Sequence, residues 1–159
     1  MIVHEKFDSI SYINDIALLK LAEPINLDNK YYIPACLPLI NEDNDSQNKT
    51  AWVTGWGSTY YGGSATIEKR QVSMLVLSDS KCKQYYSQVY NIASQICAGE
   101  SNGNSGACYG DSGGPFVRQM QDGRWYVIGI VSWGYDCGKG TVFTRVEYFL
   151  PWINDKMNK

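Results

Sequence analysis

With 159 residues and 44% hydrophobic residues, the chain is the size of a single domain with a buried core. Its net charge is −2 and its lysines and arginines are scattered singly, which excludes a basic nucleic-acid surface. The apolar stretch 126–133 is too short to span a membrane, and residues 1–6 lack the apolar core of a signal peptide, so we expect neither nucleic acid nor membrane as a partner.

The first third of the chain reads as extended segments followed by a connector. Residues 1–7 have an extended pattern, and residues 14–21 predict a buried strand that is entered by Asp15. Residues 22–39 contain three prolines and predict an irregular connection. An acid at a strand entrance is usually a turn or cap residue, so Asp15 on its own is weak evidence for catalysis.

The middle of the chain alternates strand and turn signals. Residues 51–57 predict a strand ending in Gly-Trp-Gly, with Trp56 expected in the core. After a glycine-rich turn, residues 71–77 predict a strand with alternate apolar residues on one face. Residues 79–86 then predict a short helix that carries Cys82 and is capped by Ser78 or Asp79.

The last third predicts two strands and a helix. Residues 124–134 are rich in β-branched and aromatic residues and predict a long strand. Residues 141–146 predict the last strand. From Phe149 onward, apolar residues at 149, 150, 152 and 153 indicate a C-terminal helix.

Between these strands lies Gly110-Asp111-Ser112-Gly113-Gly114-Pro115. Glycines allow positive φ angles, so this run suits a tight turn that presents the Ser112 side chain together with backbone N–H groups. An acyl-transfer site needs such a serine, a base to activate it and N–H donors for the oxyanion. An ordinary surface turn is the alternative interpretation of the hexapeptide alone.

The cysteines favour disulfides over metal binding. There is no C-x-x-C pair and only one histidine, His4, so we expect no metal and no cofactor. Disulfides require an oxidising compartment, which predicts a secreted protein whose export signal lies upstream of Met1. Two glycosylation sequons, at Asn44 and Asn48, agree with secretion, although sequons also arise by chance in Asn-rich loops. The odd number of cysteines indicates that one of them pairs outside the chain. The five are Cys36, Cys82, Cys97, Cys108 and Cys137.

An Asp leading an Ile-Ala-Leu-Leu-Lys-Leu strand, followed downstream by Gly-Asp-Ser-Gly-Gly-Pro, resembles the chymotrypsin and trypsin family of serine endopeptidases. The resemblance covers essentially the whole chain and implies an all-β fold: a chymotrypsin-like antiparallel β-barrel with a C-terminal α-helix. It implies that residues 1–27 are the end of a mostly missing first barrel and residues 28–50 the connector. Residues 51–159 would be a complete second barrel with its helix.

The resemblance also implies roles for individual residues. Ser112 would be the nucleophile, Asp15 the triad acid, and the N–H groups of Gly110 and Ser112 the oxyanion hole. Asp111 would pair with a new N-terminal ammonium created by activation cleavage. The implied disulfides are Cys82 with Cys97 and Cys108 with Cys137, while Cys36 would tether the peptidase to an upstream segment.

The base of the triad is the difficulty. His4 matches a common surface position of the family, and the triad histidine lies much further upstream of the acid than His4 does. We therefore expect the catalytic histidine to precede Met1 and the chain alone to be inactive.

The resemblance assigns the substrate site to residues around the nucleophile. Ser132 would contact the triad acid, and Trp133 and Gly134 would border the primary pocket and offer backbone groups to a polypeptide substrate. Gly106 replaces the aspartate of members that cleave after Lys or Arg, and Thr141 replaces a usual glycine, so we expect small or medium apolar side chains in the pocket. The remaining expected pocket residues are Ala107 and Tyr109.

The main alternative is a non-catalytic homologue that acts as a binding or regulatory module. Departures at Gly106 and Thr141 and a shortened segment 137–143 favour it weakly. Retention of Ser112, Asp111, Gly110 and Asp15 favours the enzyme, because a non-catalytic module has no chemical need for them.

Overall fold

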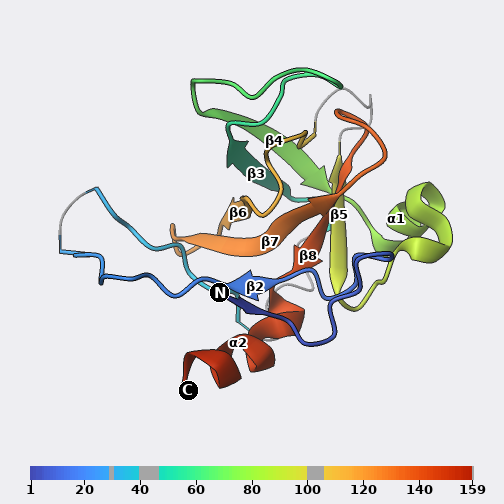
Figure 1. The fold of residues 1–159 in the computed structure, drawn as a ribbon. Helices are drawn as coiled ribbons and strands as arrows, with labels where there is room; N and C mark the ends of the chain where they lie inside the picture. Colours follow the sequence, from blue (N-terminus) through green and yellow to red (C-terminus); the bar gives the residue numbers. More distant parts are fainter. Residues whose placement is uncertain (29–30, 40–46, 100–105, 159) are drawn as a thin grey trace.

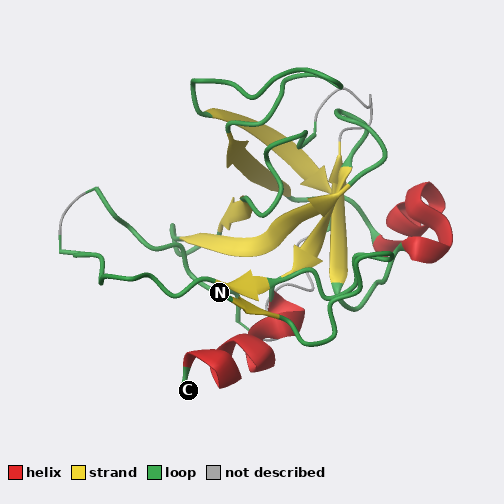
Figure 2. Ribbon diagram, in the orientation of Figure 1, coloured by secondary structure: helices red, strands yellow, loops and turns green. Residues whose placement is uncertain are grey.

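The computed structural model describes residues 1–28, 31–39, 47–99 and 106–158, and its centre is a closed antiparallel barrel of six strands (Figures 1 and 2). The strand order is β3-β4-β5-β8-β7-β6, and pairing of β3 with β6 closes the barrel. The strands are β3 (Thr50–Gly55), β4 (Arg70–Val76), β5 (Gln95–Gly99), β6 (Pro115–Gln119), β7 (Trp125–Trp133) and β8 (Thr141–Arg145).

The barrel interior is filled by the alternate apolar residues of these strands. Phe116 and Phe143 stack at its centre with ring centroids 4.1 Å apart. Gly129 lies beside them, and a Cβ there would come within 2.9 Å of Phe143 and 3.3 Å of Phe116 Cβ. The close stacking therefore explains the glycine in the middle of β7, where a side chain would otherwise favour the strand.

The first helix, α1 (Asp79–Tyr86), has the bounds that the sequence predicts. Ser78 is its N-cap, with Oγ accepting the N–H of Lys81 at 3.4 Å. The buried Cys82 joins the helix to Cys97 on β5 through a disulfide. The single-turn helix η2 (Ser87–Val89) follows directly.

The C-terminal helix α2 (Leu150–Met157) follows η3 (Glu147–Phe149) and packs beside the N-terminal segment (Figure 1). A small apolar cluster joins the two, with Ile16 on one side and Phe149 and Ile153 on the other. On the surface, Trp152 Nε1 donates to Glu5 Oε2 at 2.9 Å and Lys156 forms an ion pair with Glu5.

The N-terminal prediction was partly wrong. Residues 14–21 are not a long buried strand: only β2 (Ala17–Leu18) is formed, paired with β1 (Ile2–Val3), and Leu19 is 72% exposed. Only Ile16 of this run is buried, because the two-residue partner strand and α2 cover one end of it. In the described residues no further strand pairs with β1 or β2.

Two other details differ from the sequence-based expectations. Trp56 is 53% exposed, with the Lys69 ammonium 5.2 Å from its ring, and so does not belong to the core. Strands β5 and β6 were not predicted. The Asn44 sequon lies outside the described residues, whereas Asn48 is exposed in a turn before β3. None of the helices in the described ranges is long and apolar enough to cross a bilayer.

Candidate active site

Ser112 is exposed at the tip of the glycine turn between β5 and β6. The flanking Gly110 and Gly113 have φ angles of +96° and +77°, a region in which a side chain would be strained. The turn is fixed to β7, since Gly113 N donates to Val131 O at 2.8 Å and Val131 N donates to Gly114 O at 2.9 Å. The barrel therefore holds the serine rigidly although its side chain faces solvent.

The side chain of Asp111 points inward, where backbone N–H groups bind its carboxylate. Its Oδ1 accepts from Gly57 N at 2.9 Å, and its Oδ2 accepts from Cys108 N at 3.1 Å. Gly55 and Gly57 have no room for a Cβ because the carboxylate of Asp111 occupies that space. The Gly-Trp-Gly motif is thus explained by its glycines, which admit Asp111, and not by burial of the tryptophan.

Asp15 lies before β2 and is held by the two strands of the barrel that face it. Ser132 Oγ on β7 donates to Asp15 Oδ2 at 2.7 Å, and Thr144 Oγ1 on β8 donates to the Asp15 carbonyl at 2.7 Å. These contacts join residues that are 117 and 129 positions apart in the sequence. The contact of Ser132 with Asp15 is the one that the family resemblance implied.

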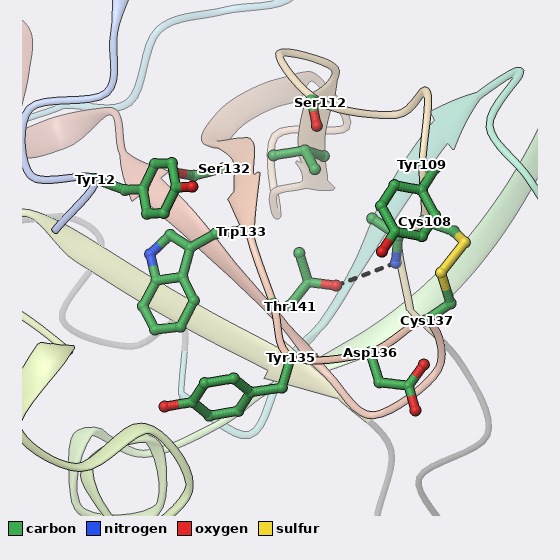
Figure 3. Close-up of a pocket in the computed structure, with 13 residues that line it drawn as sticks. Tyr12, Cys108, Tyr109, Ser112, Ser132, Trp133, Tyr135, Asp136, Cys137 and Thr141 are labelled. Carbon is green, nitrogen blue, oxygen red and sulfur yellow. Dashed lines mark hydrogen bonds between the residues drawn. A yellow bond between two sulfur atoms is a disulfide. The ribbon is translucent and has the colours of Figure 1, made fainter. Parts of the chain in front are cut away.

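A cavity of about 300 Å³ lies beside Ser112 (Figure 3). Figure 3 shows Trp133 and Tyr12 on one side of it and Tyr109 on the other. Its lining includes the expected nucleophile, Ser112, and six of the seven expected substrate-binding residues: Ala107, Tyr109, Ser132, Trp133, Gly134 and Thr141.

Thr141 forms part of the cavity lining and is 2% exposed. Its Oγ1 accepts the N–H of Ala107 at 3.1 Å, so the hydroxyl satisfies a backbone donor of the pocket wall. Gly106 does not line this cavity. It lines a second one of about 510 Å³, together with Asp111, Gly55 and Gly57, and a Cβ on Gly106 would lie 3.3 Å from Thr141 Oγ1.

Four further lining residues were not found from the sequence: Tyr12, Val131, Tyr135 and Asp136. The Asp136 carboxylate forms an ion pair with Lys139 at 2.9 Å, and this hydrogen bond holds the pKa of Asp136 below its usual value. Its position directly before Cys137 could have indicated Asp136, since the implied bridge to Cys108 brings this segment close to the serine turn. Tyr12 had no such signal.

Aromatic rings pack around the cavity on both sides. Trp133 contacts Tyr12, with centroids 6.5 Å apart, and Tyr86, with centroids 5.2 Å apart. Burial raises the pKa of Tyr86 to about 12, so this phenol stays neutral at physiological pH. Opposite them, the Tyr109 ring packs against Tyr61, and a hydrogen bond between the two phenols raises the pKa of Tyr109.

The disulfide Cys108–Cys137 links the serine turn to the wall of the cavity, and together with Cys82–Cys97 it makes up the two bridges that the resemblance implied. Cys36 is a free cysteine whose backbone pairs with β7: its N–H donates to Trp125 O at 2.8 Å. In the described part of the chain, no three His, Cys, Asp or Glu side chains cluster as metal ligands would.

His4 lies in the N-terminal segment and packs against the residues of η3 and α2. Its ring packs edge-on against Phe149, with centroids 5.4 Å apart, and against Trp152, with centroids 5.0 Å apart. Its Nδ1 accepts the N–H of Lys6 at 3.2 Å. The histidine therefore belongs to the contact between the N-terminal segment and α2.

A closed six-stranded barrel with a C-terminal helix, a serine on a glycine turn and an acid held across the barrel defines a chymotrypsin-like protein. A family model described as Trypsin matches residues 1–153, and the chain belongs to the trypsin family.

Curated relatives are trypsin-like serine proteases. The chain is 36% identical over 160 residues to serine protease filzig of Drosophila melanogaster, covering 96% of this chain and 9% of that protein. It is 36% identical over 159 residues to the proclotting enzyme of Tachypleus tridentatus, covering 97% and 42%, and 39% identical over 163 residues to transmembrane protease serine 7 of Rattus norvegicus, covering 97% and 19%. The chain thus spans less than half the length of these relatives.

Proposed function

We propose that the chain carries the nucleophile, the triad acid and the primary pocket of a secreted serine endopeptidase. One observation carries this proposal: Ser132, which holds Asp15, lines the same cavity as Ser112. A nucleophile, an orienting carboxylate and a substrate-sized cavity therefore meet at one place on the barrel, which is what acyl transfer to a serine requires.

The roles follow those of the Ser-His-Asp triad of this family. Ser112 Oγ attacks the scissile carbonyl of a polypeptide and forms an acyl-enzyme, while the N–H groups of Gly110 and Ser112 stabilise the oxyanion. Asp15 orients the histidine that takes the proton of Ser112 and returns it to the leaving amine. Since His4 packs against α2, that histidine is supplied from outside these 159 residues, and the chain alone is inactive.

The division of the chain follows from this assignment. Residues 1–27 belong to a first barrel, residues 28–50 connect it to the second, and residues 51–159 form the second barrel with α2. The exposed apolar side chains of the first segment, such as Leu19 and Leu21, would be covered by the remainder of the first barrel. Cys36 would form a disulfide tether to an upstream segment.

Activation would act through Asp111. The second cavity, of about 510 Å³, opens onto its carboxylate and offers room for a newly cleaved N-terminus. An ammonium there would gain a charge-assisted contact with Asp111, and the turn that carries Gly110 and Ser112 would be fixed by it.

The pocket favours small or medium apolar side chains. Thr141 and Ala107 occupy its wall without a charge, and the lining acid Asp136 is already paired with Lys139. A basic substrate side chain would therefore find no free carboxylate in this cavity among the described lining residues. The two disulfides and the exposed Asn48 sequon support a secreted, glycosylated protein.

The test is covalent labelling with a fluorophosphonate probe. In the full-length activated protein, the probe should label the wild type and Ser80→Ala, an exposed serine on α1, but not Ser112→Ala. The 159-residue chain should label hardly at all, because removing the base of such a triad costs about 10⁶ in rate. Absence of labelling in the full-length protein would favour the non-catalytic homologue instead, and strong labelling of the short chain would refute the need for an external histidine.

A further inference from the structure

Gln95, at the start of β5, is a polar side chain that is only 1% exposed. Its Oε1 accepts the N–H of Asn91 at 2.9 Å, and its Nε2 donates to the main-chain carbonyl of Tyr12 at 3.4 Å. A carboxamide buried to this degree is tolerated where its polar atoms are hydrogen-bonded. The second contact crosses 83 residues of sequence and reaches the segment that leads into Asp15.

That segment has an unusual backbone. Tyr12 has a φ angle of +53° and Asn14 one of +59°, a left-handed conformation that is uncommon for asparagine and rarer for a bulky residue such as tyrosine. Such a conformation persists where surrounding contacts determine it. Besides the contact from Gln95, Asn14 Nδ2 donates to Lys6 O at 2.7 Å and Asp8 N donates to Ile13 O at 3.0 Å.

The conformation of this segment decides where the Tyr12 ring lies. The ring stacks on Trp133 with an interplanar angle of 25°, and both rings line the cavity beside Ser112 (Figure 3). Tyr12 is 43% exposed, so few contacts of its own side chain hold it there. The hydrogen bond from Gln95 to the Tyr12 carbonyl therefore ties this wall of the cleft to β5.

Gln95 is itself fixed to the barrel. Its carbonyl accepts from Arg145 Nη2 at 3.0 Å and from the Tyr90 hydroxyl at 3.1 Å, and Arg145 also pairs with Asp79 on α1 at 3.5 Å. Strand β5 pairs with β8 through Gln95 and Thr144. The same β8 residue, Thr144, binds the carbonyl of Asp15, so the two contacts hold the N-terminal segment at two points three residues apart.

We propose that Gln95 is a positioning residue for the substrate cleft: its buried carboxamide fixes Tyr12 against Trp133 and thereby sets how tightly an extended substrate binds. Gln95 does not line the cavity, so it acts through Tyr12 and not by touching the substrate. The proposal rests on the proposed function and adds to it a determinant for the part of the substrate beyond the primary pocket.

Steady-state kinetics of the full-length activated protein test the proposal with two substrates. Both carry the same apolar residue on the acyl side of the bond that is cleaved. One is a tetrapeptide amide, which reaches the Tyr12 wall, and the other is an acetylated single-residue ester, which does not. Gln95→Met keeps the volume and removes the donor. We expect it to raise KM for the tetrapeptide about fivefold or more, with kcat and the ester reaction changed less than about twofold.

A double-mutant comparison separates positioning from general destabilisation. Tyr12→Ala removes the ring but keeps the carbonyl, and it should give the same KM effect. In the double variant the two effects should not multiply, because Gln95 acts through the ring that is already absent. Equal losses on both substrates, or multiplying effects, would overturn the proposal.

Hydrogen exchange on the 159-residue chain gives a readout that needs no activity. In Gln95→Met, amides of residues 8–14 should exchange about tenfold faster while those of residues 96–98 keep their rates. Gln95→Leu, a second apolar replacement of similar volume that lacks the donor, should give the same local change if the methionine variant does not fold. Unchanged exchange in residues 8–14 refutes the positioning role. Failure of the wild type to hydrolyse either substrate refutes the proposed function instead, and the exchange comparison still decides the role of Gln95.

Discussion

Ser132 Oγ donates a 2.7 Å hydrogen bond to Asp15 Oδ2, so a strand of the barrel directly orients an acid that lies outside the barrel. Thr144 on the neighbouring strand binds the carbonyl of the same aspartate. Because β7 and β8 are paired, the two donors move together, and the direction of the carboxylate is set by the barrel. Asp15 is thereby held with one oxygen committed to Ser132.

Removal of the Ser132 hydroxyl should impair catalysis without unfolding the protein. In the full-length activated protein, we expect Ser132→Ala to lower kcat about tenfold, because one donor to the carboxylate is lost. Ser94→Ala is the control, since Ser94 is a buried serine whose Oγ has no partner among the described residues. Equal effects of the two variants on kcat would show that the Ser132–Asp15 contact has no catalytic value.

Thr141 should limit the size of the side chain that the pocket accepts. We expect Thr141→Gly to raise kcat/KM for substrates with phenylalanine in the pocket, relative to kcat/KM for substrates with alanine there, by about tenfold. A change of one or two carbon atoms in a pocket wall alters specificity by about this factor. Thr141→Ser keeps the hydroxyl that binds Ala107 N–H and removes one methyl group, so it should shift the ratio less and preserve stability. A ratio that stays constant in both variants would mean that Thr141 does not border the bound side chain.

Lys139 should suppress cleavage after basic residues by occupying Asp136. We expect Lys139→Gln to raise kcat/KM for lysine substrates about three- to fivefold relative to apolar ones, and added salt to reduce this gain. Lys83→Gln on α1 alters net charge equally and serves as the control. If both variants change the ratio equally, the effect comes from overall charge and not from the freed carboxylate.

The contact of Glu5 with Lys156 and Trp152 should make stability depend on pH. The hydrogen bond from Lys156 is the largest cause that lowers the pKa of Glu5 to about 2, with a further contribution from Trp152. A lowered carboxyl pKa stabilises the fold above the unfolded value, roughly 4.3, and this contribution is lost as the pH falls from there towards 2.

The measurement is the thermal midpoint of the 159-residue chain between pH 7 and pH 2. Glu5→Gln should melt at a lower temperature than the wild type at pH 7, and the difference should disappear near pH 2. Glu23→Gln, at an exposed glutamate directly before Pro24, should show no such pH-dependent difference. A Glu5→Gln difference that is constant with pH would mean that the contact is stabilised by packing and not by charge.

The sequence predicts most of the barrel because its local signals agree with its tertiary structure. The Ser78 cap, the short helix and its cysteine all point to α1, and the β-branched run after Arg124 predicts β7. Strand β6 was missed because its five residues follow directly on the serine turn, and only two of them, Phe116 and Val117, are strongly strand-favouring. The prediction of a strand at 14–21 was wrong because an apolar run forms a buried strand only where a sheet is present to pair with it and cover it.

Residues of the candidate site could be predicted where they belong to a sequence motif. They could not be predicted where only a long-range contact in the fold brings them to the site. Ser112 and Asp111 were found from the glycine run, and Asp15 from its strand entrance combined with that motif. Gln95 was not, because a polar residue in a strand gives no sign of being buried. Tyr12 was missed for a similar reason: its left-handed backbone is set by contacts with residues 83 positions away.

The long sequence separation of the contacts at the site also has a consequence for folding. Gly57 and Asp111 are 54 residues apart, and Asp15 and Ser132 are 117 apart, so neither pair meets until distant segments have been brought together. Contacts of this kind form late, because the entropy of closing long loops must be overcome first. A nascent or partly folded chain therefore lacks the contacts that hold Asp111 and Asp15 until the strands of the barrel have been brought together.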